Sequence, residues 1–417
     1  MDKFRIIGQK NLSGKIYVSG AKNAILPIMT AALLAKGKSV LHNVPALNDI
    51  KMMAHLLRVI GARVDFYDGV MTIDSSNCSY YEAPYELVSK MRASIYVLGP
   101  LLARFKNAKV SFPGGCAIGS RPVNLHLDVM ETLGAKITFD HGYIVAKTTG
   151  LTGGKINFPK VSVGATANAL MAAVLAKGET IIANAAKEPE IGSLIDFLNK
   201  MGAQIKGRDS DSLHIFGVEE LHSVEMEMIP DRIEAATFLV AGAITKSEID
   251  VINCKTEHLK VFIDKLEKTG CKVEEIPNGA RLIPSKTIKP VNIITEPYPG
   301  FPTDLQAQFM SLMCLADGVS EITETIFPDR FMHNDELNRL NANIRKESNK
   351  AFITGVKEME GANVMATDLR ASAALVLAGL AAKGETVISR IYHIDRGYER
   401  IENKLRKIGA DIIRIQG

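Results

Sequence analysis

Six cationic side chains stand in this sequence at or just before the points where helices are predicted to begin. They are Lys22, Arg92, Arg121, Arg330, Arg370 and Arg396. The N-terminus of a helix exposes free backbone N–H groups and the positive end of the helix dipole, so it attracts anions and disfavours cations. A lysine or arginine there adds to the positive field, and arginine can hold phosphate or carboxylate through two parallel hydrogen bonds. The pattern predicts a site for a strongly anionic ligand.

A simpler interpretation exists for each of these turns taken alone. Ser162, Asp231 and Asp368 precede predicted helices, where such residues are commonly plain N-caps. An arginine in a loop is commonly solvated and contributes little to stability. The anion hypothesis therefore depends on the recurrence of cations at equivalent places, and not on any single residue.

Cys116 differs from the other cysteines in its surroundings. It lies in the segment 113–122, which is rich in glycine and contains Arg121. The glycines predict a loop, and a neighbouring cation favours the reactive thiolate. An exposed but idle cysteine is the alternative. The remaining cysteines have no CxxC spacing and are expected to be unpaired core or incidental residues: Cys78, Cys254, Cys271 and Cys314.

Composition and missing motifs exclude several classes of function. The net charge of +4 over 417 residues is thinly spread, which argues against a dedicated nucleic-acid binder. The nine histidines form no ligand cluster, so no metal is expected, and neither GxGxxG nor a GxSxG elbow occurs. No apolar run reaches the ~20 residues of a membrane span. No apolar signal core follows Met1, and we expect a cytoplasmic protein.

The elements that must position these residues repeat six times along the chain. A helix-ending Gly-Ala or its variant recurs at intervals of 68 to 73 residues. The copies begin at Gly61, Gly134, Gly202, Gly270, Asn341 and Gly409. An amphipathic stretch precedes each copy and a β-rich stretch follows it, so the glycine suits a left-handed helix end. A second helix, apolar nearly all round and therefore expected to be buried, lies earlier in each unit.

Each unit is predicted to run strand, apolar helix, strand, amphipathic helix, strand, strand. Three such units make a reasonable domain. We expect one domain to span residues 21–229, with the Cys116 loop, and a second to combine residues 1–20 with 230–417. The first strand, predicted at Lys3–Ile7, and the last, at Asp411–Ile415, are expected to pair.

These residues resemble a known family, the UDP-N-acetylglucosamine 1-carboxyvinyltransferases, which are enolpyruvyl transferases. The resemblance covers the chain from about Lys3 to Ile415. The segments that carry it are 19–24 (SGAKNA), 113–122 around the cysteine, 161–164, 329–333 (DRFMH), 366–370 (ATDLR) and 392–401 (YHIDRGYERI). It implies an inside-out α/β barrel, in which two domains of three pseudo-symmetric βαβαββ repeats bury their helices behind outer sheets.

The resemblance also implies a reaction. Enolpyruvyl is transferred from phosphoenolpyruvate to the C3 hydroxyl of UDP-N-acetylglucosamine, with release of phosphate, at the first committed step of peptidoglycan synthesis. Addition followed by elimination passes through a tetrahedral ketal, without a metal or cofactor. Cys116 would be the general acid that fosfomycin alkylates, and Asp304 the base. Lys22, Arg121 and Arg396 would face phosphate, with Lys22 and Arg396 counted as catalytic, while Arg330 and Arg370 would face carboxylate.

The remaining implied contacts concern the substrates, chiefly the nucleotide sugar. They are Asn23, Arg92, Pro122, Val123, Asn124, Leu125, Lys160, Ser162, Val163, Gly164, Ile326, Asp368 and Leu369. Asn124 stands where many relatives have Asp, which replaces a charged contact near the uracil by an amide. Two rival functions stay open: a ring or cradle that holds nucleic acid or a protein, and the sister activity of 5-enolpyruvylshikimate-3-phosphate synthase.

Overall fold

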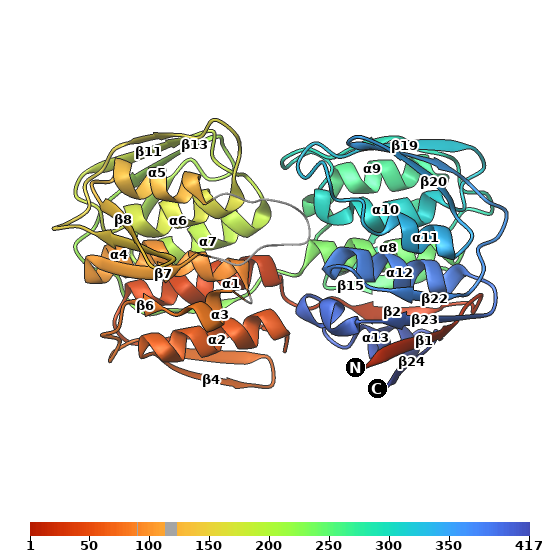
Figure 1. The fold of residues 1–417 in the computed structure, drawn as a ribbon, viewed down its shortest axis with the longest axis horizontal. Coiled ribbons are helices and arrows are strands. Elements are labelled where there is room, and N and C mark those ends of the chain that lie inside the picture. The colour runs from red at the N-terminus through yellow and green to blue at the C-terminus, as the bar shows by residue number, and fades with distance from the viewer. Residues whose placement is uncertain (90, 113–122) are drawn as a thin grey trace. The chain divides into compact units, whose positions relative to one another are not determined.

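The computed structural model describes residues 1–89, 91–112 and 123–417 (Figure 1). The described chain divides into two compact units. The terminal unit contains both chain ends, Met1–Ser19 and Pro230–Gly417, and the middle unit contains residues 20–112 and 123–229. The chain therefore passes from one unit to the other at Ser19–Gly20 and again at Ile229–Pro230.

The middle unit contains three repeats, closed by a last strand. Its strands are β3 (Lys38–His42), β4 (Arg63–Tyr67), β5 (Val70–Asp74), β6 (Glu82–Ala83), β7 (Asn107–Ser111), β8 (Lys136–Asp140), β9 (Tyr143–Lys147), β10 (Lys155–Asn157), β11 (Glu179–Ala183), β12 (Gln204–Lys206), β13 (Ser212–Phe216) and β14 (Glu225–Glu227). Its helices are α1 (Lys22–Ala31), η1 (Ala32–Leu34), α2 (Asn48–Ile60), α3 (Tyr85–Val88), η2 (Arg92–Val97), α4 (Leu98–Phe105), α5 (Asn124–Thr132), α6 (Val163–Ala173) and α7 (Pro189–Lys200), where η marks a 3-10 helix.

The terminal unit has the same organisation. Its strands are β1 (Lys3–Ile7), β2 (Gly14–Tyr17), β15 (Ile249–Ile252), β16 (Lys272–Ile276), β17 (Gly279–Ile283), β18 (Ile293–Ile294), β19 (Val319–Thr323), β20 (Asn343–Glu347), β21 (Lys350–Thr354), β22 (Asn363–Met365), β23 (Glu385–Ser389) and β24 (Asp411–Ile415). Its helices are α8 (Arg232–Ile244), η3 (Thr256–His258), α9 (Lys260–Lys268), η4 (Thr303–Leu305), α10 (Gln306–Met313), α11 (Asn334–Arg339), α12 (Leu369–Ala381), η5 (Ile391–Arg396) and α13 (Ile401–Lys407).

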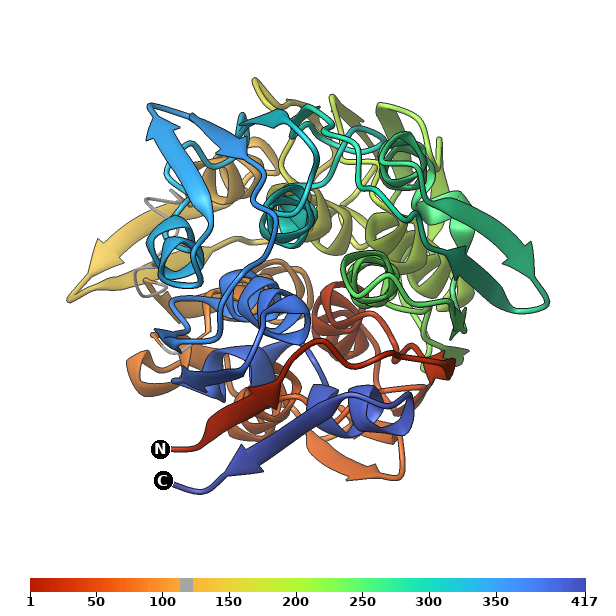
Figure 2. The same ribbon diagram turned by 90° about the vertical axis from the view of Figure 1, so that its right-hand side faces the viewer.

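The described residues form six four-stranded sheets of one design. In the sheet ordered β10-β11-β13-β12, β10 is parallel to β11 and the other neighbours are antiparallel. The predicted pairing of the first and last strands is confirmed: β1 and β24 run antiparallel, with Lys3 opposite Ile415 (Figure 2). The N-terminal segment thus completes two sheets of the terminal unit, because β2 also pairs with β15.

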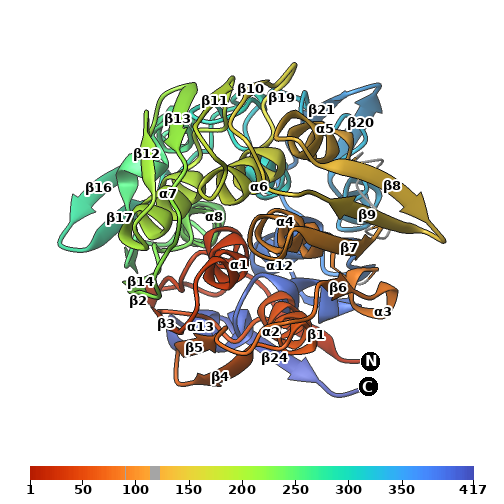
Figure 3. The ribbon, with the colours of Figure 1, turned by 90° about the vertical axis from the view of Figure 1, so that its left-hand side faces the viewer.

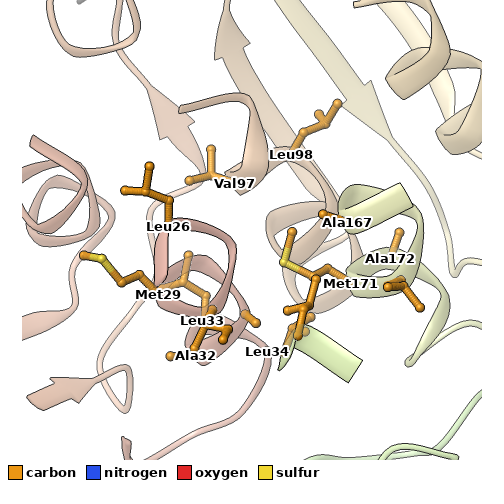
Figure 4. Packing of buried hydrophobic residues seen from close by; sticks show 14 of the residues in the cluster. Leu26, Met29, Ala32, Leu33, Leu34, Val97, Leu98, Ala167, Met171 and Ala172 are labelled. Atoms are coloured by element: carbon orange, nitrogen blue, oxygen red, sulfur yellow. The ribbon is translucent and has the colours of Figure 1, made fainter. Parts of the chain in front are cut away.

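Apolar helices occupy the centre of each unit, as the inside-out architecture predicts. Figure 3 shows α1, α4 and α6 surrounded by the sheets of the middle unit. Every residue of α8 in the terminal unit is buried. In Figure 4, Leu26 and Met29 of α1 and Met171 of α6 lie in one apolar cluster. The predicted fold of two three-repeat α/β domains is confirmed.

Glycine is needed at one close contact between helices, and at two helix ends a glycine or an asparagine adopts the left-handed conformation. A Cβ on Gly99 of α4 would lie 2.8 Å from the carbonyl oxygen of Asn168 in α6, so only glycine allows these helices to approach. At the helix end after α7, Gly202 has φ of 106°, the left-handed region that favours glycine. Asn341 adopts φ of 66° at the equivalent place, which asparagine tolerates.

Candidate functional site

Three acidic residues stand where the buried helices of the terminal unit begin, but their side chains have different partners. Asp231 caps α8 by accepting hydrogen bonds from the backbone N–H groups of Ile233 and Glu234. Asp368 caps α12 in the same way. The capping interpretation holds for both, as it does for Ser162 at α6 in the middle unit. Asp304 instead lies in η4 and points its carboxylate at two arginines.

Asp304 is held between the guanidinium groups of Arg330 and Arg370. Arg330 Nη1 donates to Oδ1 at 2.8 Å, and Arg370 Nη2 donates to Oδ2 at 3.1 Å. Arg330 and Arg370 are only 5% and 3% exposed, whereas 28% of the Asp304 side chain is exposed. Buried arginines around a partly open carboxylate form a site where an incoming anion could compete for the same donors. All three residues were predicted as site residues, and the structure brings them together.

The surroundings of Arg370 favour its charged form, and those of Arg330 hold its side chain in place. Burial alone would lower the pKa of Arg370, but Asp304, Tyr398 and Asp231 outweigh it and raise that pKa above its ordinary value. Arg330 is also fixed through Thr303, whose Oγ1 accepts from Arg330 Nη1 at 3.0 Å. Two permanent positive charges in a nearly buried place therefore favour a dianionic or carboxylate-bearing ligand.

Glu324, which the sequence did not reveal, organises the loop beside these arginines. Its fully buried carboxylate accepts from Thr295 Oγ1 at 2.6 Å and from Thr303 Oγ1 at 2.8 Å. It also accepts from the backbone N–H groups of Ile326 and Phe327 at 2.9 and 3.0 Å. The predicted contact residue Ile326 thus has its backbone fixed to the turn that carries Asp304. A lone glutamate after a strand gave no sign of this role in the sequence.

Arg396 was expected at or just before the start of a helix, and the structure corrects this placement. It ends η5, and α13 begins only at Ile401. The pKa of the neighbouring His393 is lowered, first by burial and then by the charge of Arg396. Leu369, another predicted contact, is the first residue of α12 and is partly buried beside Arg370.

In the middle unit, Lys22 is the first residue of the buried helix α1. Its Nζ lies 3.1 Å from Asp49 Oδ2 in the first turn of α2, and both side chains are nearly buried. Asn23 follows in the same turn of α1, and Arg92 begins η2. Lys22 therefore adds its positive charge to the positive end of the α1 helix dipole, and the two together favour an anion.

A buried histidine lies beside the predicted nucleotide-sugar residues. Asn168 Oδ1 accepts from Gly99 N–H, so its Nδ2 donates to Ile95 O at 3.0 Å and to His126 Nδ1 at 2.8 Å. His126 is therefore neutral, with its proton on Nε2. Burial, followed by the charge of Arg92, lowers the pKa of His126 to about 4. A Cβ at Gly164 would lie 3.2 Å from Nε2, so glycine keeps this N–H uncrowded.

The other predicted contact residues of the middle unit lie at chain positions around α5 and α6. Val123 and Leu125 are buried, Asn124 and Lys160 are exposed, and Val163 begins α6. Cys116, Arg121 and Pro122 lie outside the described residues. Across the rest of the chain, Cys78, Cys254, Cys271 and Cys314 are buried and unpaired, as expected.

Metal-binding clusters and membrane-spanning helices are both absent from the described ranges. Residues 1–89, 91–112 and 123–417 hold no group of three His, Cys, Asp or Glu side chains placed to bind a metal ion. No helix among those same residues has the length and apolar character needed to cross a membrane.

Comparison with known proteins places this geometry in a family. Residues 6–405 match the family described as EPSP synthase (3-phosphoshikimate 1-carboxyvinyltransferase). A Geotalea uraniireducens protein named UDP-N-acetylglucosamine 1-carboxyvinyltransferase is 53% identical over 416 residues, covering 100% of both chains. A Chloroherpeton thalassium protein of the same name is 54% identical over 417 residues, covering 99% of this chain and 97% of that protein.

Solved structures of enolpyruvyl transferases share this fold. The enolpyruvyl transferase NikO from Streptomyces tendae superposes with a TM-score of 0.91 at 26% sequence identity, covering 100% of this chain and 99% of NikO. An EPSP synthase from Acinetobacter baumannii superposes with a TM-score of 0.77 at 18% identity, covering 100% of both chains, which shows the shared fold alone.

Proposed function

The chain belongs to the EPSP synthase family of enolpyruvyl transferases, and from this premise we propose that it transfers enolpyruvyl from phosphoenolpyruvate to the C3 hydroxyl of UDP-N-acetylglucosamine. The choice of acceptor rests on one observation: over its full length the chain shares more than half of its residues with proteins named for that reaction. The reaction releases phosphate and commits the sugar nucleotide to peptidoglycan synthesis.

The proposed chemistry has two steps. In the addition, a proton from the Cys116 thiol goes to the methylene carbon of phosphoenolpyruvate, and the sugar oxygen bonds to the adjacent carbon while Asp304 takes the hydroxyl proton. In the elimination, the bond from that carbon to the phosphate oxygen breaks and phosphate leaves with the bonding electrons. The new methyl group returns a proton to the Cys116 thiolate, and its C–H electrons restore the double bond. General acid–base help of this kind supplies about 10²–10⁴-fold in rate. No electrons are gained or lost overall, so the chemistry calls for no redox cofactor.

The charges of the terminal unit suit the carboxylate of phosphoenolpyruvate. Arg330 and Arg370 are buried, charged and already bound to a carboxylate, that of Asp304. We assign them to the substrate carboxylate, with Asp304 sharing their donors. Lys22, Arg121 and Arg396 are assigned to the phosphate, where fixed positive charge stabilises the charge that develops during addition. Lys22 and Arg396 thereby count with Cys116 and Asp304 as catalytic residues.

The nucleotide sugar is assigned to the remaining predicted contacts, most of them in the middle unit. These are Asn23, Arg92, Pro122, Val123, Asn124, Leu125, Lys160, Ser162, Val163, Gly164, Ile326, Asp368 and Leu369. The neutral His126 N–H beside Gly164 is consistent with an acceptor-rich ligand nearby. Because both substrates are highly charged metabolites that do not cross a membrane unaided, we place the protein in the cytoplasm.

The function is tested by phosphate release. Purified protein should release phosphate only when phosphoenolpyruvate and UDP-N-acetylglucosamine are both present, and each substrate alone is the control. Absence of release with the pair would overturn the proposal. Release with shikimate-3-phosphate in place of the sugar nucleotide would assign the chain to the sister activity.

The role of Cys116 is tested by covalent labelling. Fosfomycin should add to the wild-type chain, and Cys116→Ser should lose both the adduct and most turnover. Cys254→Ser is the matched control, because Cys254 is buried and burial raises its pKa to about 12, which keeps that thiol unreactive. An adduct that persists in Cys116→Ser would move the reactive thiol elsewhere.

A further inference from the structure

Tyr398 lies in the interior of the terminal unit and touches the arginine assigned to the substrate carboxylate. The residue is 1% exposed and follows η5 in the chain. Its hydroxyl lies 3.2 Å from Arg370 Nη1, 3.2 Å from Gln308 Nε2 and 2.8 Å from Thr237 Oγ1. These partners come from α12, α10 and α8, so one phenol joins the three buried helices of this unit.

The direction of every hydrogen bond in this group follows from the chemistry of its members. Arginine and the amide nitrogen of glutamine can only donate. A phenol oxygen has one hydrogen and two lone pairs, so both lone pairs of Tyr398 accept and its own hydrogen is given to Thr237. The Thr237 hydroxyl then donates to the carbonyl oxygen of Ile233 at 2.8 Å. Gln308 Nε2 also donates to Thr237 Oγ1 at 3.4 Å. A chain of donors therefore runs from the Arg370 guanidinium through Tyr398 and Thr237 to the backbone of α8.

The same group also reaches Asp304. Gln308 Nε2 donates to the carbonyl oxygen of Asp304 at 2.9 Å, while Arg370 Nη2 holds the Asp304 carboxylate. The aromatic ring of Tyr398 lies 5.6 Å from the Arg370 guanidinium carbon, within range of a cation–π contact. Burial raises the pKa of Tyr398, so the phenol stays protonated and the direction of the chain is fixed.

We propose that Tyr398 is a positioning residue that fixes the rotation of the Arg370 guanidinium, so that one edge of it faces Asp304 and the carboxylate of phosphoenolpyruvate. The inference rests on the proposed function for the identity of that carboxylate. Without the hydroxyl, Arg370 Nη1 loses an acceptor in a buried place, and the guanidinium gains freedom that substrate binding must then remove. The loss falls on one substrate, because the Tyr398 contacts described above do not involve residues assigned to the nucleotide sugar.

The first test is Tyr398→Phe, which keeps the ring and removes one oxygen. The KM for phosphoenolpyruvate should rise about tenfold, equivalent to about 1.4 kcal/mol, while the KM for UDP-N-acetylglucosamine stays within about twofold. Tyr143→Phe is the matched control, because it removes a hydroxyl that accepts from Tyr85 N–H at the surface of the other unit. An equal rise in both KM values, or unchanged KM values with a lower Tm, would overturn the proposal in favour of simple core packing.

Thr237→Val gives a second route that leaves the Tyr398 hydroxyl and ring in place. The variant should raise the KM for phosphoenolpyruvate by a smaller factor, because it removes the partner of the phenol hydrogen and leaves Arg370 its acceptor on Tyr398. A rise confined to the KM for the nucleotide sugar would contradict the chain of donors.

A third readout does not depend on enzymatic activity. In protein labelled with 15N-arginine, the Arg370 guanidinium signal, assigned by its loss in Arg370→Lys, should report slow rotation in the wild type and fast rotation in Tyr398→Phe. Equal rotation in the two proteins would refute the positioning role even in an active enzyme. If the guanidinium rotates slowly in the wild type and fast in Tyr398→Phe, but the protein transfers no enolpyruvyl, the positioning role of Tyr398 is supported and only the proposed function fails.

Discussion

Replacing Lys404 by methionine should leave the buried carboxylate of Glu234 without its ion-pair partner. The stability of the terminal unit should then depend more strongly on pH. Lys404 Nζ lies 2.7 Å from Glu234 Oε1 and 2.7 Å from Ser19 Oγ. Glu234 also accepts from the backbone N–H of Ser19 at 2.6 Å, at the point where the chain leaves this unit. The Glu234 side chain is 2% exposed and that of Lys404 is 18% exposed, so water screens the pair poorly.

The sign of the effect follows from the raised pKa of Glu234. Burial raises this pKa above 4.5, and Lys404 opposes that rise. A carboxyl whose folded pKa is raised stabilises the fold below its unfolded pKa, and that contribution is lost as pH rises through the folded value. Removing Lys404 raises the folded pKa further, so the loss extends over a wider range above pH 4.5.

The size of the effect has an upper limit. In the variant, Glu234 can take up a proton instead of remaining charged, so the loss cannot exceed the free energy of protonating it. At pH 7, about 2.5 units above its ordinary pKa of 4.5, that protonation costs about 3.4 kcal/mol. The wild type already carries part of this cost because its Glu234 pKa is already raised. We therefore expect Lys404→Met to lose less than the limit, about 2 kcal/mol at pH 7, which is a fall in Tm of about 4–8 °C for a unit of about 200 residues. The deficit should shrink to a small packing difference near pH 5.

Thermal unfolding followed by circular dichroism at pH 5, 6, 7 and 8 measures this deficit. The double variant Glu234→Gln, Lys404→Met is the matched control, because it removes both charges and should recover most of the stability at every pH. A deficit in Lys404→Met that is equal at pH 5 and pH 8 would refute the electrostatic reasoning and assign Lys404 a packing role.

Three further results are expected. Asp304→Asn should fold normally and lose about 10²–10⁴-fold in kcat, and a loss below about tenfold in steady-state kinetics would remove Asp304 as the base. His126 and His333 have pKa values lowered from 6.5 to about 4, first of all by burial. The unfolded chain therefore binds protons first, and the free energy of unfolding, measured by denaturant titration, should fall as pH drops from 6.5 to 4, by up to about 3.4 kcal/mol per histidine. The fall should be smaller in His126→Gln. Gly202→Ala should cost about 1–2 kcal/mol because its φ is 106°, whereas Asn341→Gly should change the denaturant midpoint little.

The repeat architecture could be read from the sequence because its signals are local. A helix that must end in the left-handed region leaves a glycine, or at Asn341 an asparagine, in the sequence. The apolar helix that precedes Gly178 has almost no polar face because it is buried on all sides. The pairing of Lys3–Ile7 with Asp411–Ile415 could be anticipated because the first strand precedes the first full unit and the last strand ends the sixth, so each could complete the same repeat.

Residues whose partners are distant in the chain were harder to predict. The charge of Arg370 indicated an anion site, but nothing near it in the sequence indicated Tyr398 or Gln308 as its neighbours. Glu234 and Lys404 each look like ordinary helix-surface residues, yet they form a buried pair across 170 positions of the chain. Arg396 was misplaced because a 3-10 helix, η5, comes before the last α-helix and gives no clear periodic signal.

Enolpyruvyl transfer by addition and elimination leaves an isotopic mark in product formed in D2O. Protein incubated in D2O with phosphoenolpyruvate and UDP-N-acetylglucosamine should give, by NMR, an enolpyruvyl ether at the sugar C3 oxygen. Deuterium should appear in its methylene group, because a methyl group forms and then loses a proton. A C3 ether without deuterium, or phosphate released with no ether, would contradict the account.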